Sequence, residues 1–196
     1  SIVLVIDPQN DFCHPDGALG LSGADVSPMD AAIEQSRTLL SEARAAGVPV
    51  IFVKIVHDRW SDTPMWMSRK TQRDGKDPCR AGTWGAEFYK IAPGPDDYTI
   101  VKRRYSAFIG TELENVLRAT GRDVLIFAGM ATSVCVESTA RDACMRDFGV
   151  VVLNDCTADY DPDAHYWSLR NISTAFGWVA SAQEVAAVWG ESTNTD

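Results

Sequence analysis

The sequence predicts a three-layer α/β/α domain, in which helices cover both faces of a six-stranded parallel sheet. Short apolar, β-branched runs alternate along the chain with longer amphipathic stretches. The runs are apolar almost throughout instead of alternating with polar residues, which is typical of parallel strands buried on both faces. Crossovers between parallel strands are right-handed, so the intervening helices form a layer on each side of the sheet.

Each element has its own local signal. The first strand is an unbroken aliphatic run, and the first long helix carries a proline in its first turn and ends at Gly47. The later strands are β-branched runs that follow turn residues. We expect strands at residues 2–6, 50–56, 98–101, 123–128, 150–153 and 177–180, and helices at 28–46, 110–120, 135–147, 161–175 and 182–189.

Residues 57–97 do not follow this alternation. They contain Trp60, Trp66 and Trp84, many charges and little periodicity, so we expect a long, partly helical insertion. Three tryptophans favour a packed lid over a disordered linker. With 196 residues, one domain at 1–190 with this insertion is expected, followed by a polar tail at 191–196.

Composition narrows the class of protein. The chain has a net charge of −9 and a pI near 4.8, which disfavours binding to nucleic acid or to an anionic membrane. The aliphatic runs are too short to span a bilayer, and no signal peptide is visible. Five cysteines suit a reducing cytoplasm better than a disulfide framework. The three histidines are far apart and form no metal motif. We therefore expect a cytoplasmic protein that binds a small-molecule substrate.

Three polar residues lie in the segments that leave the strands, at the edge of the sheet where open α/β folds bind ligands. Asp7 is either a turn residue or a partly desolvated acid–base group. Lys102 either belongs to a solvated basic loop or is drawn inside, where it needs a carboxylate partner. Cys135 lies near a helix start, which stabilises a thiolate and supplies N–H groups for an oxyanion. The alternative is a small buried apolar residue, the assignment that we give to Cys13, Cys79, Cys144 and Cys156.

These strand exits lie in three motifs: D-x-Q-N-D-F from Asp7, K-x-R-Y-S-A-F from Lys102, and G-x-A-T-x-x-C-V-x-S-T-x-R-D from Gly129. Over essentially its whole length the chain resembles the isochorismatase-like cysteine hydrolase family. The resemblance implies a Rossmann-like sheet in the order 3-2-1-4-5-6 and a homodimer or homotetramer. It also implies a catalytic triad of Asp7, Lys102 and Cys135, an oxyanion hole from the N–H groups of Ala131 and Cys135, and a cis peptide just before Ala131.

Within that family the sequence is most similar to the ureide-cleaving amidohydrolases, on the Y-S-A-F run from Tyr105 and the F-G-W-V run from Phe176. The Asp-x-His pair that nicotinamidases use to bind a metal is missing from residues 54–58, so we expect no metal and no cofactor. The resemblance implies a cysteine-dependent amidohydrolase that cleaves a C–N bond of a small ureido or carbamoyl compound through a thioester, releasing ammonia or an amine. Alternatives are hydrolysis of biuret or of another small carboxamide, and, remotely, non-catalytic binding of a small molecule.

For the substrate pocket we expect aromatic walls and polar contacts from Gln9, Phe12, Trp84, Arg104, Tyr105, Phe108 and Thr132. The insertion would close over the substrate with Trp60, Trp66, Trp84 and Phe88, unless these rings only pack the insertion onto the sheet. A substrate with an acidic end would need an arginine to pair its carboxylate. The candidates are Arg59, Arg69, Arg73, Arg80 and Arg104.

Overall fold

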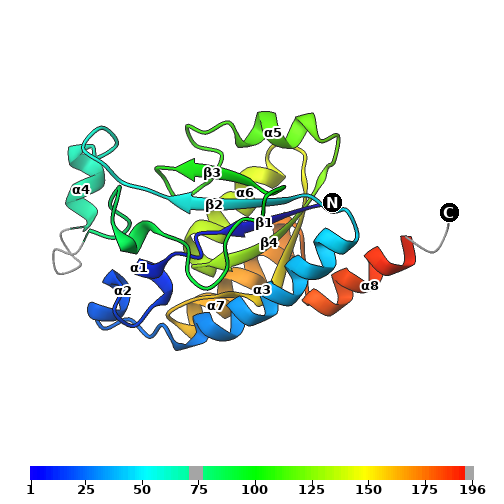
Figure 1. The fold of residues 1–196 in the computed structure, drawn as a ribbon, viewed down its shortest axis with the longest axis horizontal. Helices are drawn as coiled ribbons and strands as arrows, with labels where there is room; N and C mark the ends of the chain where they lie inside the picture. Colours follow the sequence, from blue (N-terminus) through cyan, green and yellow to red (C-terminus); the bar gives the residue numbers. More distant parts are fainter. Residues whose placement is uncertain (71–76, 193–196) are drawn as a thin grey trace.

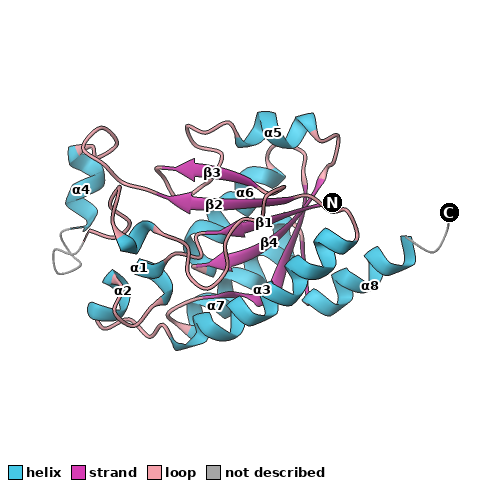
Figure 2. Cartoon of the chain, viewed as in Figure 1, coloured by secondary structure: helices cyan, strands magenta, loops and turns pink. Residues whose placement is uncertain are grey.

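A parallel sheet in the order β3-β2-β1-β4-β5-β6 organises the chain. Figures 1 and 2 show β3, β2, β1 and β4 side by side in this order. The computed structural model describes residues 1–70 and 77–192. All five strand pairs are parallel, which confirms the expected fold class and strand order. The strands are β1 (Ile2–Ile6), β2 (Val50–Ile55), β3 (Tyr98–Lys102), β4 (Val124–Met130), β5 (Gly149–Ala158) and β6 (Trp178–Ala180).

Alternate residues of β1 show how the two faces of the sheet are covered. Val3 and Val5 belong to one buried cluster, which includes residues of the helices α3 (Ser27–Ala45) and α8 (Ala182–Ser192). Ile2, Leu4 and Ile6 belong to a second cluster on the opposite face, because successive strand side chains point in opposite directions. That face is covered by α5 (Leu113–Ala119) and α6 (Glu137–Cys144), together with the start of the π-helical turn η3 (Ile172–Phe176).

Two expected helices are interrupted by π-helical turns. The segment expected to be helical from residue 135 instead starts with η2 (Thr132–Val136), and α6 begins only at Glu137. The segment expected at 161–175 divides into α7 (Pro162–Asn171) and η3. Cys135 therefore lies inside a π-helical turn and not at the first turn of an α-helix. Short π-turns inside helical segments are often found at functional sites.

Strand β5 is longer than expected. It continues to Ala158, five residues past the apolar run, and its pairing with β4 shifts register between Phe127 and Gly129. Gly129 has φ +110°, and a Cβ on it would lie 2.0 Å from the Ile6 carbonyl oxygen. Only glycine permits this close approach of β4 to the end of β1.

The segment from 57 to 97 contains α4 (Pro64–Lys70) and a 3₁₀ turn η1 (Trp84–Ala86). An isolated bridge from Gln9 to Phe88 attaches it to the segment that follows β1, and a bridge from His57 to Arg80 joins two parts of it. Two four-residue helices, α1 (Asn10–Cys13) and α2 (Ala18–Leu21), precede α3 and were not expected. All five cysteines are free thiols. Among the described helices, none combines the length and the apolar character that crossing a membrane requires.

Candidate active site

Asp7 leaves β1 at the carboxyl edge of the sheet and is completely buried. Its backbone N–H still donates to the Val53 carbonyl of β2 at 2.9 Å, so the strand pairing continues up to this residue. Its φ is +51°, a left-handed conformation that aspartate tolerates better than most residues. The chain therefore turns sharply at Asp7, and the carboxylate remains inside the protein.

Lys102 is the last residue of β3 and pairs with Ile55 of β2. Because β2 separates β3 from β1, the backbones of β3 and β1 lie about 9 to 10 Å apart. The fully buried lysine side chain spans this gap, and its Nζ lies 2.7 Å from Asp7 Oδ2. Nζ also donates to the Arg104 carbonyl at 3.1 Å. The structure therefore places Lys102 inside, with the carboxylate partner that a buried lysine requires.

Cys135 completes this group. Its Sγ lies 3.2 Å from Lys102 Nζ, and the residue is buried. The turn around it is tightly hydrogen-bonded, because the N–H groups of Val134 and Val136 both donate to the Ala131 carbonyl at 3.2 Å. Ala131 and Cys135 both line the cavity described below. The peptide bond before Ala131 is cis, as the resemblance implied.

Burial and mutual charge set the protonation of these three groups. Burial raises the pKa of the Cys135 thiol to about 12, although the neighbouring Lys102 ammonium opposes the shift. Burial also raises the pKa of the Asp7 carboxyl above its usual value, against the effect of Lys102. Burial disfavours the Lys102 cation, but the Asp7 carboxylate and the Cys135 sulfur outweigh it and raise its pKa. At neutral pH the thiol is therefore protonated, and it needs a base to become a nucleophile.

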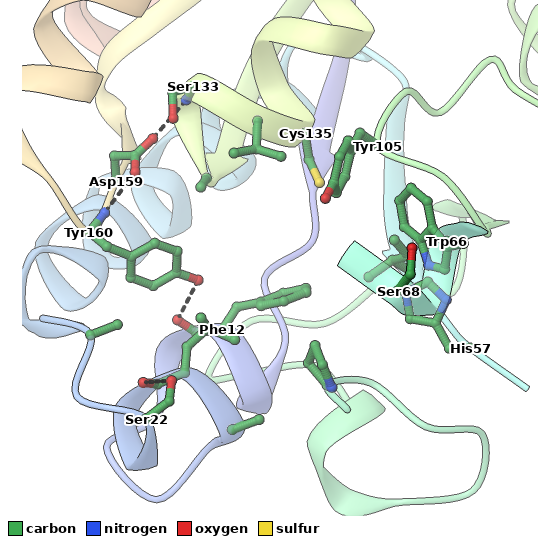
Figure 3. Close-up of a pocket in the computed structure, with 17 residues that line it drawn as sticks. Phe12, Ser22, His57, Trp66, Ser68, Tyr105, Ser133, Cys135, Asp159 and Tyr160 are labelled. Atoms are coloured by element: carbon green, nitrogen blue, oxygen red, sulfur yellow. Dashed lines mark hydrogen bonds between the residues drawn. The ribbon is translucent and has the colours of Figure 1, made fainter. Parts of the chain in front are cut away.

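A cavity of about 810 Å³ opens above Cys135. Figure 3 shows Cys135 between two walls, with Tyr105, Trp66, Ser68 and His57 on one side and Asp159 and Tyr160 on the other. The Trp66 and Tyr105 rings contact each other with centroids 4.9 Å apart. The described lining residues are Phe12, Ala18, Leu19, Ser22, Ala24, Ile55, His57, Trp66, Ser68, Pro78, Tyr105, Ala131, Ser133, Val134, Cys135, Asp159 and Tyr160.

Of the residues expected to bind substrate, Phe12 and Tyr105 line this cavity. Gln9 is fully buried, donates to the carbonyls of Ile55 and Ala86, and accepts the Ile55 N–H, so it ties the insertion to β2. Thr132 is buried against His165. Neither belongs to the lining, and backbone and side-chain partners occupy their polar groups.

Other aromatic residues of the expected pocket also lie elsewhere. Phe108 packs against Phe148 with ring centroids 6.2 Å apart. Trp84 is half exposed and meets His14 edge to face, and Trp60 is 82% exposed. Phe88 packs against Phe52 in the core beneath the insertion. Trp66 is the one insertion tryptophan that the cavity lining includes among the described residues.

The described arginines that were candidates for a substrate carboxylate are engaged with other partners. Arg104 donates to the Ser61 carbonyl at 3.3 Å, and its guanidinium lies 4.7 Å from the Trp66 ring centre. Arg80 pairs with Asp62 and Asp77, and Arg59 lies over the Trp60 ring. Arg73 and the side chain of Arg69 lie outside the described residues. The described cavity lining contains no lysine or arginine.

Several lining residues were not anticipated from the sequence, among them Asp159, Tyr160 and Ser133. Asp159 directly follows β5, so inspection of strand exits would have found it if the full length of β5 had been recognised. Tyr160 donates its hydroxyl hydrogen bond to the Phe12 carbonyl at 3.1 Å and closes one side of the cavity. Within residues 1–70 and 77–192, no three His, Cys, Asp or Glu side chains are grouped to hold a metal ion.

Known proteins that are similar to this chain in sequence or structure agree on one family. Residues 1–184 match the isochorismatase domain family. A ureidoacrylate amidohydrolase of Caulobacter vibrioides is 36% identical, and the match covers 96% of this chain and 91% of the relative. One from Stutzerimonas stutzeri is 40% identical over 91% of this chain and 78% of the relative. A cysteine hydrolase from Pseudomonas syringae superimposes with a TM-score of 0.85 at 30% identity, covering 97% of this chain and 92% of that one.

Proposed function

The chain belongs to the isochorismatase family, and we propose that it is a cysteine-dependent amidohydrolase that cleaves a C–N bond of a small ureido or carbamoyl compound. One observation carries this proposal. A buried ammonium lies 2.7 Å from the Asp7 carboxylate and 3.2 Å from the Cys135 sulfur, at the base of a cavity large enough for a small molecule.

The first half of the reaction uses the Asp7 carboxylate as a general base. It removes the proton from the Cys135 thiol, and the resulting Sγ anion attacks the carbonyl carbon. The electron pair of the C=O bond moves to oxygen, which receives hydrogen bonds from the N–H groups of Ala131 and Cys135. The Lys102 ammonium stabilises the negative charge on Asp7 or on Cys135 while the proton moves from the thiol to the carboxylate.

The second half releases the two products. Asp7 returns the proton to the leaving nitrogen, the C–N bond breaks, and ammonia or an amine departs. The acyl group remains on Cys135 as a thioester, which for a ureido carbon is a thiocarbamate. Water then attacks this carbonyl while Asp7 takes its proton, and the Cys135 sulfur leaves and is reprotonated.

The substrate class rests on the relatives and on the character of the cavity. The two relatives described above are named for a ureide. A solved N-carbamoylsarcosine amidase of Thermoplasma acidophilum is 27% identical, with a TM-score of 0.74 over 92% of this chain and 95% of that one. The cavity combines aromatic walls from Trp66 and Tyr105 with polar groups such as Ser133, which suits a small, flat molecule with several N–H and C=O groups.

The test is a measurement of ammonia release from biuret, ureidoacrylate, N-carbamoyl amino acids and nicotinamide, with Cys135→Ala as the matched control. The proposal predicts turnover of at least one ureido or carbamoyl compound by the native chain and none by the variant. Matched ureides with and without a carboxylate then show whether the substrate has an acidic end. Activity confined to nicotinamide would replace the proposed substrate class, and turnover by Cys135→Ala would contradict the cysteine mechanism.

A further inference from the structure

Asp159 contacts the turn that carries Cys135, although the proposed reaction gives it no role. It follows β5 directly and is 7% exposed. Its Oδ2 accepts the Ser133 N–H at 2.7 Å, and its Oδ1 accepts the Tyr160 N–H at 2.9 Å (Figure 3). Hydrogen bonds from N–H groups to a carboxylate are roughly twice as strong as those between neutral partners. Asp159 is therefore a strong, buried attachment point for the start of this turn.

Helix α7 provides a second attachment, one residue earlier in the turn. Ser168 donates to the Thr132 carbonyl at 3.2 Å, and the Thr132 hydroxyl lies 2.9 Å from His165 Nδ1. Burial lowers the pKa of His165, so the imidazole is neutral at pH 7. Thr132 and Ser133 are thus fixed by side chains from outside the turn, two to three residues before the nucleophile.

These attachments determine where the N–H of Cys135 points. The Ser133 N–H is committed to Asp159, and those of Val134 and Val136 are committed to the Ala131 carbonyl. Because each peptide unit is planar, fixing its neighbours leaves the Cys135 N–H little freedom to rotate. A donor to an oxyanion must lie 2.7 to 3.1 Å from where the charge develops, and a displacement of about 1 Å can cost roughly 100-fold in rate.

We propose that Asp159 is a positioning residue, which holds the Ser133 peptide and thereby keeps the Cys135 N–H and thiol aligned with the substrate carbonyl. This inference rests on the proposed function, because it assigns Asp159 to the same reaction. The positioning role requires a hydrogen-bond acceptor at this place more than it requires a negative charge. An asparagine, whose side-chain oxygen can accept the Ser133 N–H, should therefore retain part of the effect, and an alanine should retain none.

The first test compares kcat and KM for Asp159→Ala and Asp159→Asn with the best ureide. We expect kcat to fall about 30- to 100-fold for alanine and about 3- to 10-fold for asparagine, with KM changed less than about threefold. Asp163→Ala is the matched control, because Asp163 is an exposed aspartate close by in the chain, in the first turn of α7, and the Asp161 cap stays intact. Its kcat should stay within about twofold of the native value.

A second readout needs no turnover. Iodoacetamide alkylates Cys135 at a rate that reports on the thiol itself. Propanal adds reversibly to the same thiol: an S–C bond forms, the C=O electron pair moves to oxygen, and the thiol proton is transferred to that oxygen. The degree to which propanal protects Cys135 from alkylation therefore measures how well the turn stabilises the oxygen of the adduct. In Asp159→Ala we expect an alkylation rate within about threefold of native and at least tenfold weaker protection by propanal.

Each outcome decides the proposal. If Asp159→Ala changes neither kcat nor the protection by propanal, the positioning role is overturned. It is also overturned if KM rises while kcat stays native, because Asp159 would then be a substrate-binding group. A loss of alkylation as large as the loss of kcat would indicate general disruption and would also overturn it. If Asp159→Ala fails to fold, the same criteria are applied to the kcat, KM and propanal protection of Asp159→Asn. If the native chain hydrolyses no ureide, the proposed function fails, while the propanal result still tests the role of Asp159.

Discussion

At the scale of single residues, the proposed reaction uses Asp7 as a base, Lys102 as a cation and Cys135 as a nucleophile. The thiol of Cys135 has a pKa of about 12 because it is buried, so little thiolate exists at neutral pH before the substrate binds. The buried Asp7 carboxylate has a raised pKa and is therefore a stronger base than an exposed aspartate. In this account the site is activated by proton transfer inside the protein and does not depend on a standing thiolate.

This division predicts the pH dependence of kcat/KM. Asp7 must be ionised to accept the thiol proton, so activity is present above its pKa and is lost as pH falls through it. Because burial raises that pKa above the ordinary value of 3.8, the acid limb should lie at higher pH than for an exposed aspartate. A pH profile of kcat/KM from about pH 4 to 9 measures it. A flat profile down to pH 4 would contradict the assignment of Asp7 as the base.

A second residue-scale prediction separates stability from activity. Lys102→Met leaves the Asp7 carboxylate buried and unpaired, so we expect a loss of about 3 to 5 kcal/mol in unfolding free energy and no turnover. The double variant Asp7→Asn with Lys102→Met removes both charges and should recover much of the stability but none of the activity. Urea unfolding and ammonia release measure the two effects. Turnover restored in the double variant would contradict the roles of both residues.

At the scale of elements, Asp11 links helix α2 to the insertion. Its carboxylate accepts the Ala18 N–H at 2.9 Å, at the start of α2, and the Cys79 N–H at 2.6 Å, in the insertion. Leu19 of α2 and Pro78 both line the cavity, so this carboxylate fixes two parts of its wall. Gly85 packs against the same group, where a Cβ would lie 2.0 Å from Asp11 Oδ2.

We therefore predict that Asp11→Ala raises KM at least tenfold and lowers the free energy of unfolding by about 2 to 4 kcal/mol, because two hydrogen bonds to a charged group are lost. Asp16→Ala is the control, since Asp16 is exposed and lies in the same connection. Steady-state kinetics and thermal unfolding give both values. If Asp11→Ala behaved like the control, the wall of the cavity would not depend on this carboxylate.

The elements also show where prediction from sequence succeeds and where it fails. The strands were found because their apolar, β-branched runs are continuous, and β5 was cut short where the polar Asn154 and Asp155 interrupt its run. The helices α1 and α2 have four residues each, too few for a 3.6-residue periodicity to be visible. The π-helical turn around Cys135 depends on hydrogen bonds to Ala131 and Asp159, which no local sequence pattern predicts.

The candidate active site, too, could be predicted from the sequence only in part. Each of Asp7, Lys102 and Cys135 was found separately as a polar residue that follows or ends a strand or a strand-to-helix turn. That they meet depends on the strand order, which spacing alone does not determine and only the family resemblance supplied. The aromatic residues were harder to place, because a ring in the insertion can pack on the sheet, as Phe88 does, or line the cavity, as Trp66 does.

At the scale of the whole molecule, the sheet brings every group that the proposed reaction needs to one edge, between two layers of helices. We therefore expect turnover without a metal ion. Ammonia release should be unchanged, within about twofold, after exhaustive dialysis against a chelator, because nucleophile, base and oxyanion donors all come from the chain itself. Activity that is lost on chelation and restored by zinc or manganese would contradict this prediction.

The proposed function depends on attack of Cys135 on the substrate and on an acyl group that its sulfur then carries. The most direct measurement is the rate of ammonia release from the best ureide by the native chain, Cys135→Ser and Cys135→Ala, with intact-mass analysis of rapidly quenched native reactions. We expect at least about a 1000-fold loss of rate in both variants, unchanged folding by circular dichroism, and a mass increase on the native chain that corresponds to one acyl group on sulfur. Substantial turnover by either variant would contradict it.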